Sequence, residues 1–380
     1  MTDLRTRAVA YLKQLAVAAV VLIVLGALGG FFVMLSGIVP IKASSGHWAI
    51  TKAILDAAKR RSVATHTLGM KVPPLDRPGM VIIGGGQYGF ACEACHGSPA
   101  VKQPRVAAQM TPRPPDLRDV ALTYTPDELF YIVKHGIKFT GMPAWPSRQR
   151  ADEVWSMVAF LRELPSMDAK RYEDLTGRAI AQDDRLPMED MLGPAADVRP
   201  AITQNCARCH GVDGRGRGPG ALPKLAGQRW EYIAGSLAAY ARGERHSGIM
   251  EPVAANLGTD EMQAIARYYA GLPRGDDAPG TVDTRLIQEG REIAERGVPG
   301  RLIPACTECH GPGTERNPNY PRLAGQHADY IAQQLGLFKG DRRGGTAYRK
   351  IMLKIAGQLT EEQVKAVAAY YESLRELRER

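Results

Sequence analysis

The sequence predicts an all-α protein in which one membrane-spanning helix precedes three similar helical domains. Strand-like alternation of apolar and polar residues is nearly absent from the 380 residues, which argues against a β-sheet. One uncharged apolar stretch lies near the N-terminus, at residues 15–39. A pentapeptide of the form C-x-x-C-H occurs three times, at residues 92–96, 206–210 and 306–310, and similar segments follow each copy. One anchor and a threefold repeat therefore organise the chain.

The uncharged stretch from Leu15 to Val39 is longer than the roughly 20 residues that a helix needs to cross a bilayer. A cleaved signal peptide would have an apolar core of about 7–15 residues that ends in a small-x-small site. The core here is longer, and Ile41-Lys42-Ala43 fits such a site poorly. We therefore predict an uncleaved, single-pass anchor at 15–39, preceded by a short N-terminal segment at 1–14.

The segment after the anchor, residues 40–79, is predicted to be juxtamembrane. Its sequence HWAITKAILDAAKRR at 47–61 has apolar residues at helical spacing and cations near its end. Such a helix either lies along the membrane surface, with Trp48 at the lipid headgroups, or packs on the domain that follows. The sequence leaves both placements open.

The three pentapeptides consume every cysteine of the protein, so no thiol remains for a disulfide. Two cysteines three positions apart lie on one side of a helical turn, where both sulfurs can form thioethers with one edge of a porphyrin, and the next histidine can bind the iron. A zinc site would need a matching second half, and a redox dithiol would need a βαβ pattern; neither accompanies the motifs. The sequence thus predicts three covalently bound haem c groups. The attachment cysteines are Cys92, Cys95, Cys206, Cys209, Cys306 and Cys309, and the proximal ligands are His96, His210 and His310.

The segments after the pentapeptides repeat. PKLAGQRWEYIAGSL follows the second motif and PRLAGQHADYIAQQL the third, and the modules end in YYAGL and YYESL. In the first module the final helix, DEVWSMVAFLREL, has Phe160 and Leu161 where the others have paired tyrosines. Each module is predicted to contain a cysteine-bearing helix, a loop, a methionine loop and an amphipathic terminal helix, with a central helix in the second and third. The predicted domains are 80–165, 198–274 and 283–380, joined by linkers at 166–197 and 275–282.

Iron held by these histidines needs a ligand on its other face, and a methionine thioether gives the high potential of electron carriers. Met142, Met250 and Met352 each stand ten residues before an acidic residue that opens the final helix, and we expect them to be the sixth ligands. Met110 is a rival for Met142, and His246 is a rival for Met250. The terminal aromatics Phe160, Tyr268 and Tyr370 should pack near the haem edges.

These motifs make the chain resemble the class I cytochromes c. Residues 198–380 resemble the dihaem c-four type through C-x-x-C-H, P-[KR]-L-A-G-Q and M-x3-A-x2-L, and residues 80–165 resemble a single class I domain with Gly141-Met142-Pro143. The resemblance implies that a proline carbonyl holds each proximal histidine, with Pro115, Pro223 and Pro321 at the matching positions. It also implies attachment in the bacterial inner membrane, with residues 1–14 in the cytoplasm and the haem domains in the periplasm.

The net charge of +9 does not indicate nucleic-acid binding, because three haems would add about six propionates. Two basic clusters remain, and charged loops of this kind are more often solvated than part of a docking face. The clusters comprise Arg215, Arg217, Lys224 and Arg229, and Arg342, Arg343, Arg349 and Lys350.

With both axial positions of each iron occupied, no haem offers an open site for a substrate. We therefore expect an electron-transfer protein and not an enzyme, which relays electrons in a periplasmic respiratory chain to a terminal oxidase. The alternative is the cytochrome subunit of a periplasmic alcohol, aldehyde or sugar dehydrogenase that passes electrons to quinone. A haem peroxidase is a third hypothesis, but no catalytic motif accompanies the three pentapeptides. The expected partners are redox proteins: a terminal oxidase, a quinol-oxidising complex or a dehydrogenase.

Overall fold

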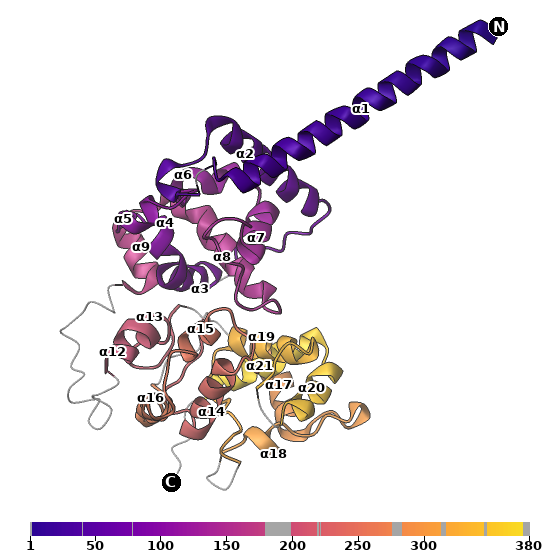
Figure 1. Ribbon diagram of the computed structural model, residues 1–380. Coiled ribbons are helices and arrows are strands. Elements are labelled where there is room, and N and C mark those ends of the chain that lie inside the picture. The colour runs from indigo at the N-terminus through magenta and orange to yellow at the C-terminus, as the bar shows by residue number, and fades with distance from the viewer. Residues whose placement is uncertain are drawn as a thin grey trace.

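The computed structural model describes residues 2–178 except Pro40 and Pro78, residues 199–275 except Pro219 and Ala221, and residues 283–374 except 313–316 and 346–347. Within these ranges the regular structure is helical, with an isolated bridge between Val298 and Ile303. Figure 1 shows a long N-terminal helix that projects away from a helical body. The all-α class predicted from the sequence is confirmed. We call the described residues 79–178, 199–275 and 283–374 the first, second and third modules.

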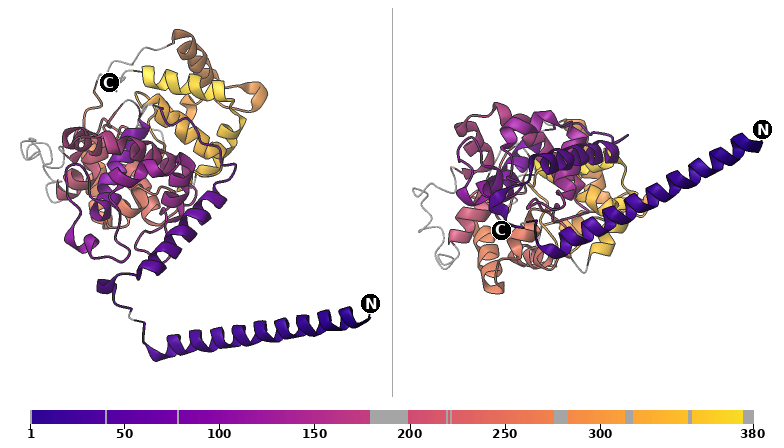
Figure 2. Two further views of the ribbon diagram at one scale, coloured as in Figure 1. Left: turned by 90° about the horizontal axis from the view of Figure 1, so that it is seen from above. Right: turned by 45° about the horizontal axis from the view of Figure 1, so that its top comes forward.

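The N-terminal helix α1 spans Thr2–Ser36 and stands clear of the three modules (Figures 1 and 2). Its part Ala8–Ser36 has a mean hydropathy of 2.7, and none of that part is buried inside the protein. The helix ends three residues before the predicted limit of the anchor at residue 39. It is long and apolar enough to cross a membrane.

The juxtamembrane segment contains the short turn η1 (Ala43–Ser45) and helix α2 (Ala49–His66). Helix α2 packs on α7 (Pro126–His135) of the first module, with Val63 buried. The His66 ring stacks on Tyr131 with a centroid separation of 5.3 Å, and the Arg60 guanidinium lies 5.4 Å from the Tyr124 ring centroid. Of the two placements left open by the sequence, packing on the first module is the one observed.

The first module is built around the crossing of its N-terminal and terminal helices, α3 and α8. Gly84 of α3 lies so close to the Ser156 carbonyl of α8 that any side chain at this position would overlap it. Helix α7, capped by Thr125 and Glu128, corresponds to the central helices of the other modules, although the sequence predicted a central helix only for those two. The remaining elements are α3 (Met80–Gln87), η2 (Tyr88–Cys92), α4 (Glu93–His96), α5 (Arg105–Ala108), α6 (Leu117–Val120), η3 (Ala121–Thr123), α8 (Ala151–Glu163), η4 (Leu164–Ser166) and α9 (Ala169–Thr176).

Helix α9 lies within the segment 166–197 that the sequence assigns to a linker. Its Tyr172 is fully buried and packs against Tyr88 and Phe160 in the core of the first module. The first core therefore extends to Thr176. The later part of this segment, residues 179–197, lies outside the described residues.

The second and third modules share one plan in which the terminal helix packs on the central helix. The deepest side chains of their cores are Tyr269 and Tyr371, the second tyrosine of each pair. The second module comprises α12 (Arg199–Ala201), η6 (Ile202–Cys206), α13 (Ala207–His210), α14 (Trp230–Ala241), α15 (Met250–Ala254) and α16 (Thr259–Gly271). The third comprises α17 (Thr284–Arg296), η7 (Pro299–Arg301), α18 (Thr307–His310), α19 (Ala328–Lys339), α20 (Arg349–Gln358) and α21 (Glu361–Ser373).

These two modules meet through an interface that is nearly symmetric, because equivalent residues from each contact the other. The Gln228 side chain donates to the Arg322 carbonyl at 3.0 Å and accepts from the Arg322 amide at 2.8 Å. The Gln326 side chain makes the same pair of bonds with Lys224, at 2.9 and 3.0 Å. Each glutamine is the last residue of the repeated P-[KR]-L-A-G-Q segment, so the repeat itself forms the interface.

Candidate haem sites

In each pentapeptide the second cysteine and the histidine lie on a short helix, α4, α13 or α18, which ends at the histidine, and the first cysteine is the N-cap residue of that helix. All six thiols are free and half-buried. Burial raises the pKa of Cys92 and of Cys206 to about 12 and that of Cys306 to about 11, so these thiols are protonated at neutral pH. Each pair thus presents two sulfurs on one helical turn, as thioether attachment requires.

Each proximal histidine is held from behind by a proline carbonyl. The distances from His Nδ1 to the carbonyl oxygen are 2.8 Å for His96 and Pro115, 3.1 Å for His210 and Pro223, and 2.9 Å for His310 and Pro321. Because Nδ1 donates to a carbonyl, the other ring nitrogen, Nε2, keeps its lone pair for a metal. Burial lowers the pKa of all three histidines, which keeps the imidazoles neutral. The hydrogen bonds implied by the family resemblance are present in all three modules.

The candidate sixth ligands of the second and third modules lie in the same cores as the cysteines. Met250 at the start of α15 and Cys206 both pack against the second core. Met352 of α20 and Cys306 both pack against the third. The rival His246 has its ring nitrogen Nδ1 3.7 Å from Glu251 Oε1.

The first module brings both of its candidate methionines to one place. Met142 is half-buried, and its amide donates to the Thr140 hydroxyl at 3.1 Å. The side chain of Met110 lies directly against Gly141, so that a Cβ at this glycine would overlap its terminal methyl group. Either sulfur could therefore serve an iron beside the Gly141-Met142-Pro143 loop.

Two aromatic residues that the sequence did not single out lie beside the proximal histidines of the first and second modules. Tyr269, not Tyr268, is fully buried, and its hydroxyl donates at 3.2 Å to the carbonyl of Gly211, the residue after His210. The first module has no tyrosine at this place in α8, but Tyr88 donates to the carbonyl of Gly97, the residue after His96, at 2.7 Å. Sequence analysis missed Tyr88 because it comes from a different helix, although it stands just before Cys92.

Two buried guanidinium groups lie at the interface of the second and third modules. Arg245 donates to the hydroxyls of Ser236 (2.9 Å) and Tyr330 (3.1 Å). Arg343 donates to the Tyr232 hydroxyl at 3.2 Å and to the Gln334 side chain at 2.7 Å. Only 4% of Arg245 and 5% of Arg343 is exposed, so the expectation of solvated loops was wrong for Arg343, which the other module covers.

In the described part of the chain neither guanidinium forms an ion pair with a carboxylate, and Arg245 Nε is buried without a hydrogen-bond partner. A buried charge of this kind is costly unless an anion compensates it. Haem carries two propionates, which are anions of the kind that these two buried guanidinium groups require. The residues present therefore fit a haem through their arginines as well as through their cysteines and histidines.

Comparison with known proteins agrees with this geometry. The family model described as cytochrome c matches residues 196–272 and 287–375, and the model described as cytochrome c oxidase, cbb3-type, subunit III matches residues 83–161. Cytochrome c4 of Pseudomonas aeruginosa is 33% identical over 202 residues, which cover 53% of this chain and 93% of that protein. The chain belongs to the class I cytochromes c. Within this cytochrome c, the second and third modules form a segment homologous to dihaem cytochrome c4.

Two further relatives each match a part of this cytochrome c. A protein named thiosulfate dehydrogenase electron acceptor, from Thiomonas intermedia (strain K12), is 36% identical over 173 residues, which cover 45% of this chain and 79% of that protein. The solved cytochrome c4 of Acidithiobacillus ferrooxidans is 37% identical, with a TM-score of 0.40, and the match covers 45% of this chain and 99% of that one.

Proposed function

We propose that this cytochrome c is a membrane-anchored trihaem electron carrier that relays electrons in a periplasmic respiratory chain to a terminal oxidase. The observation that carries the proposal is the threefold occurrence of one proximal arrangement. In each module a pair of half-buried cysteines precedes a histidine whose Nδ1 lies 2.8–3.1 Å from a proline carbonyl. Three modules of this kind, packed in contact, make a relay.

Each module would hold one covalent haem c, which supplies reversible one-electron chemistry at its iron. The protein attaches the haems through Cys92 and Cys95, Cys206 and Cys209, and Cys306 and Cys309. His96, His210 and His310, together with Met142, Met250 and Met352, would supply the ligands of the irons. Thioether ligands favour ferrous iron and so give the high potentials suited to an oxidase donor.

We place the three haem domains in the periplasm and α1 in the bacterial inner membrane. Apolar side chains along α1 are exposed to the surroundings, among them Leu22, Ile23 and Phe32. Exposure of this extent is costly in water and favourable in lipid. The domain limits follow the sequence repeat, with the first module continued to Thr176 by α9.

The oxidase as acceptor is supported by the first module, whose matching family model is named for subunit III of a cbb3-type oxidase. A second candidate function is that of electron acceptor for a periplasmic dehydrogenase. It is favoured by the relatives of the second and third modules that bear the name thiosulfate dehydrogenase electron acceptor. In both cases the protein transfers electrons and is not itself the enzyme.

The ligand set is tested with the purified holoprotein. The denatured protein should show three c-type haems by its pyridine haemochrome spectrum. Met142→His, Met250→His and Met352→His should each lower one potential and reduce the near-infrared methionine-to-iron band by about a third. Met110→Leu and His246→Ala are the matched controls. A change in the first haem with Met110→Leu, or in the second with His246→Ala, would transfer the role to that residue.

The two candidate functions are separated by the direction of electron flow in membranes of the source organism. Loss of the gene should slow oxygen uptake from an artificial donor of c-type cytochromes if the protein feeds an oxidase. If it serves a dehydrogenase, oxygen uptake from this donor stays unchanged while substrate-driven reduction of c-type haem is lost. The second outcome would overturn the assignment to the oxidase.

A further inference from the structure

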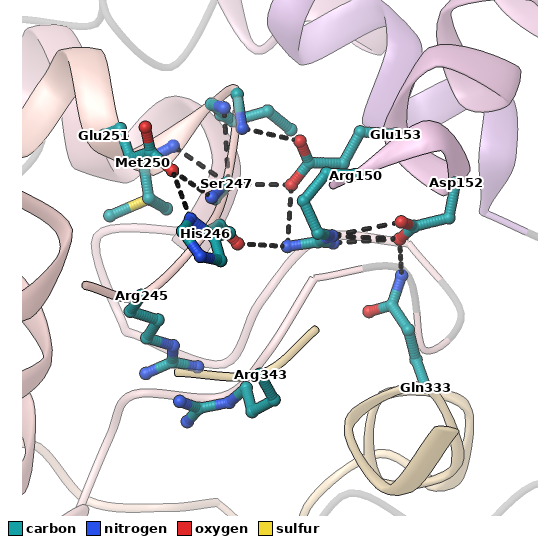
Figure 3. A network of polar contacts seen from close by, with 12 residues as sticks. Arg150, Asp152, Glu153, Arg245, His246, Ser247, Met250, Glu251, Gln333 and Arg343 are labelled. Atoms are coloured by element: carbon teal, nitrogen blue, oxygen red, sulfur yellow. Dashed lines mark hydrogen bonds and ion pairs between the residues drawn. The ribbon is translucent and has the colours of Figure 1, made fainter. Parts of the chain in front are cut away.

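A charged contact between the first and second modules surrounds Glu153, near the start of α8. Only 4% of this residue is exposed. Its Oε1 accepts a hydrogen bond from the Ser247 hydroxyl at 2.7 Å, and its Oε2 accepts one from the Gly248 amide at 2.7 Å. Figure 3 shows that the carboxylate comes from the first module while Ser247 lies on a loop of the second. One buried carboxylate of the first module thus fixes two consecutive residues of its neighbour.

Arg150 strengthens this contact. Its guanidinium lies 2.9 Å from Glu153 Oε1, forms a second ion pair with Asp152, and donates to the His246 carbonyl at 2.9 Å. Burial raises the pKa of Glu153, and Arg150, Ser247 and Gly248 oppose that rise because they favour the carboxylate. The first module therefore holds three successive residues, 246–248, through the Glu153 carboxylate and the Arg150 guanidinium. These two charges are paired with each other and hydrogen-bonded to the loop.

The loop held in this way leads directly into Met250. The Ser247 hydroxyl oxygen accepts hydrogen bonds from the amides of Met250 (3.1 Å) and Ile249 (3.3 Å). A serine hydroxyl has one proton, which goes to Glu153, so its lone pairs are free to receive these amides. The bonds run in one series from Glu153 through Ser247 to the backbone of Met250, whose side chain turns away from the carboxylate in Figure 3.

The first module also touches the other side of the second haem site. Gly86 of α3 lies against the Cys209 sulfur, and a Cβ at this glycine would come within 3.0 Å of it. Arg217 of the second module donates both to the Arg208 carbonyl, at 2.5 Å, and to the Asp174 carbonyl of α9. The first module is thus docked against the cysteine helix and the methionine loop together.

We propose that Glu153 is a positioning residue for Met250, so that docking of the first module fixes the sixth ligand, and with it the potential, of the second haem. The inference rests on the proposed function, since it takes Met250 as the iron ligand. Without the carboxylate, Ser247 loses the acceptor that orients its hydroxyl, and the backbone at Met250 is held less firmly. A thioether held less firmly stabilises ferrous iron less.

Glu153→Ala tests the proposal in the full-length holoprotein. We expect the potential of the second haem to fall while the other two stay unchanged, and the near-infrared methionine-to-iron band to lose up to about a third of its intensity. Carbon monoxide added to the reduced protein should bind up to one haem in three. Glu153→Gln keeps the size of the side chain and one acceptor, so it should give a smaller change and guard against a folding defect. Ser247→Ala should act on the same haem, and the double variant should not add to it.

Asp152→Asn is the matched control. It removes the neighbouring carboxylate from the same Arg150, but its other partner is Gln333 of the third module and not the methionine loop. An equal shift of the second haem in this variant would overturn the proposal, because loosening of the whole junction would then be the cause. A wild-type potential in Glu153→Ala, in a protein whose Met250→His variant does lower one potential, would overturn it as well. Should Met250→His move no potential, the ligand assignment itself fails and the inference falls with it.

Discussion

The junction between the second and third modules differs in kind from the junction that joins the first module to them. The former is built from residues that recur at equivalent positions in both partners: Gln228 and Gln326, Tyr232 and Tyr330, Arg245 and Arg343. The latter includes Arg150, Asp152 and Glu153, which contact the loop backbone at 246 and 248 and the side chains of Ser247 and Gln333 on the other modules. Two copies of one module can pair through the same surface, so each interface residue has an equivalent on the partner. A dissimilar module lacks that surface and needs a different set of contacts.

The largest expected effect concerns the third module. The double variant Cys306→Ala/Cys309→Ala should lose one haem of three and most of the stability of the third module, because so small a domain relies on its cofactor for a core. Haem content by pyridine haemochrome and thermal unfolding by circular dichroism measure both. Retention of three haems would show that residues 306–310 are not an attachment site.

The symmetric junction itself is broken by Gln228→Ala/Gln326→Ala, which removes four hydrogen bonds between the two modules. At roughly 0.5–1.5 kcal/mol each, the free energy of unfolding of the paired modules should fall by about 2–6 kcal/mol. Denaturant unfolding followed by circular dichroism gives the value. The two single variants should have equal effects, and Gln288→Ala, at an exposed position of α17, should have none. Clearly unequal single effects would contradict the symmetry.

The junction with the first module is tested by Gly248→Ala. Gly248 lies against the Trp145 ring, and a Cβ there would overlap the indole. We expect a loss of about 1–3 kcal/mol in the free energy of unfolding, and movement of Trp145, which tryptophan fluorescence reports. Gly235→Ala is the control, because open space surrounds this glycine of α14 and the helix should gain slightly. An unchanged stability in Gly248→Ala would mean that the two loops are not in contact in solution.

The smallest effect should come from single hydroxyl groups of the symmetric junction. Tyr232→Phe removes a bond to Arg343, and Tyr330→Phe removes the equivalent bond to Arg245. Each substitution should lower the free energy of unfolding by about 1–2 kcal/mol, because a buried charged donor loses its acceptor. Both values come from denaturant titrations of the holoprotein, and a difference of more than about 0.5 kcal/mol between them would contradict their equivalence.

The sequence predicted those features whose chemistry is local. Cysteine spacing indicated the three sites, and the family resemblance implied the proline carbonyls at His96, His210 and His310. Such features can be predicted from sequence because a covalent or metal-binding group requires fixed residue types at fixed spacings.

What the sequence could not predict depends on contacts between distant segments. Charged residues in the first turn of a helix, such as Glu153, are usually solvated, and only the docked second module buries this one. Tyr88 makes in the first module the hydrogen bond that Tyr269 of the terminal helix makes in the second. Because Tyr88 precedes the cysteine motif, an alignment of the repeats does not match the two tyrosines. Helix α9 carries no haem motif, and its place in the first core depends on packing with α3.

The hydrogen bond from the Thr111 hydroxyl to the Ala43 carbonyl, at 2.6 Å, shortens the connection between α1 and the first module. Because this bond holds η1 on the first module, residues 37–42 are the connection that remains between α1 and η1. Six residues span at most about 20 Å when fully extended. With α1 in the membrane, as we propose, the first module does not diffuse freely through the periplasm and searches for its partners in two dimensions. Encounters with a membrane-bound redox partner then take place at a high effective concentration, whereas a soluble donor has to come to the membrane to find this protein.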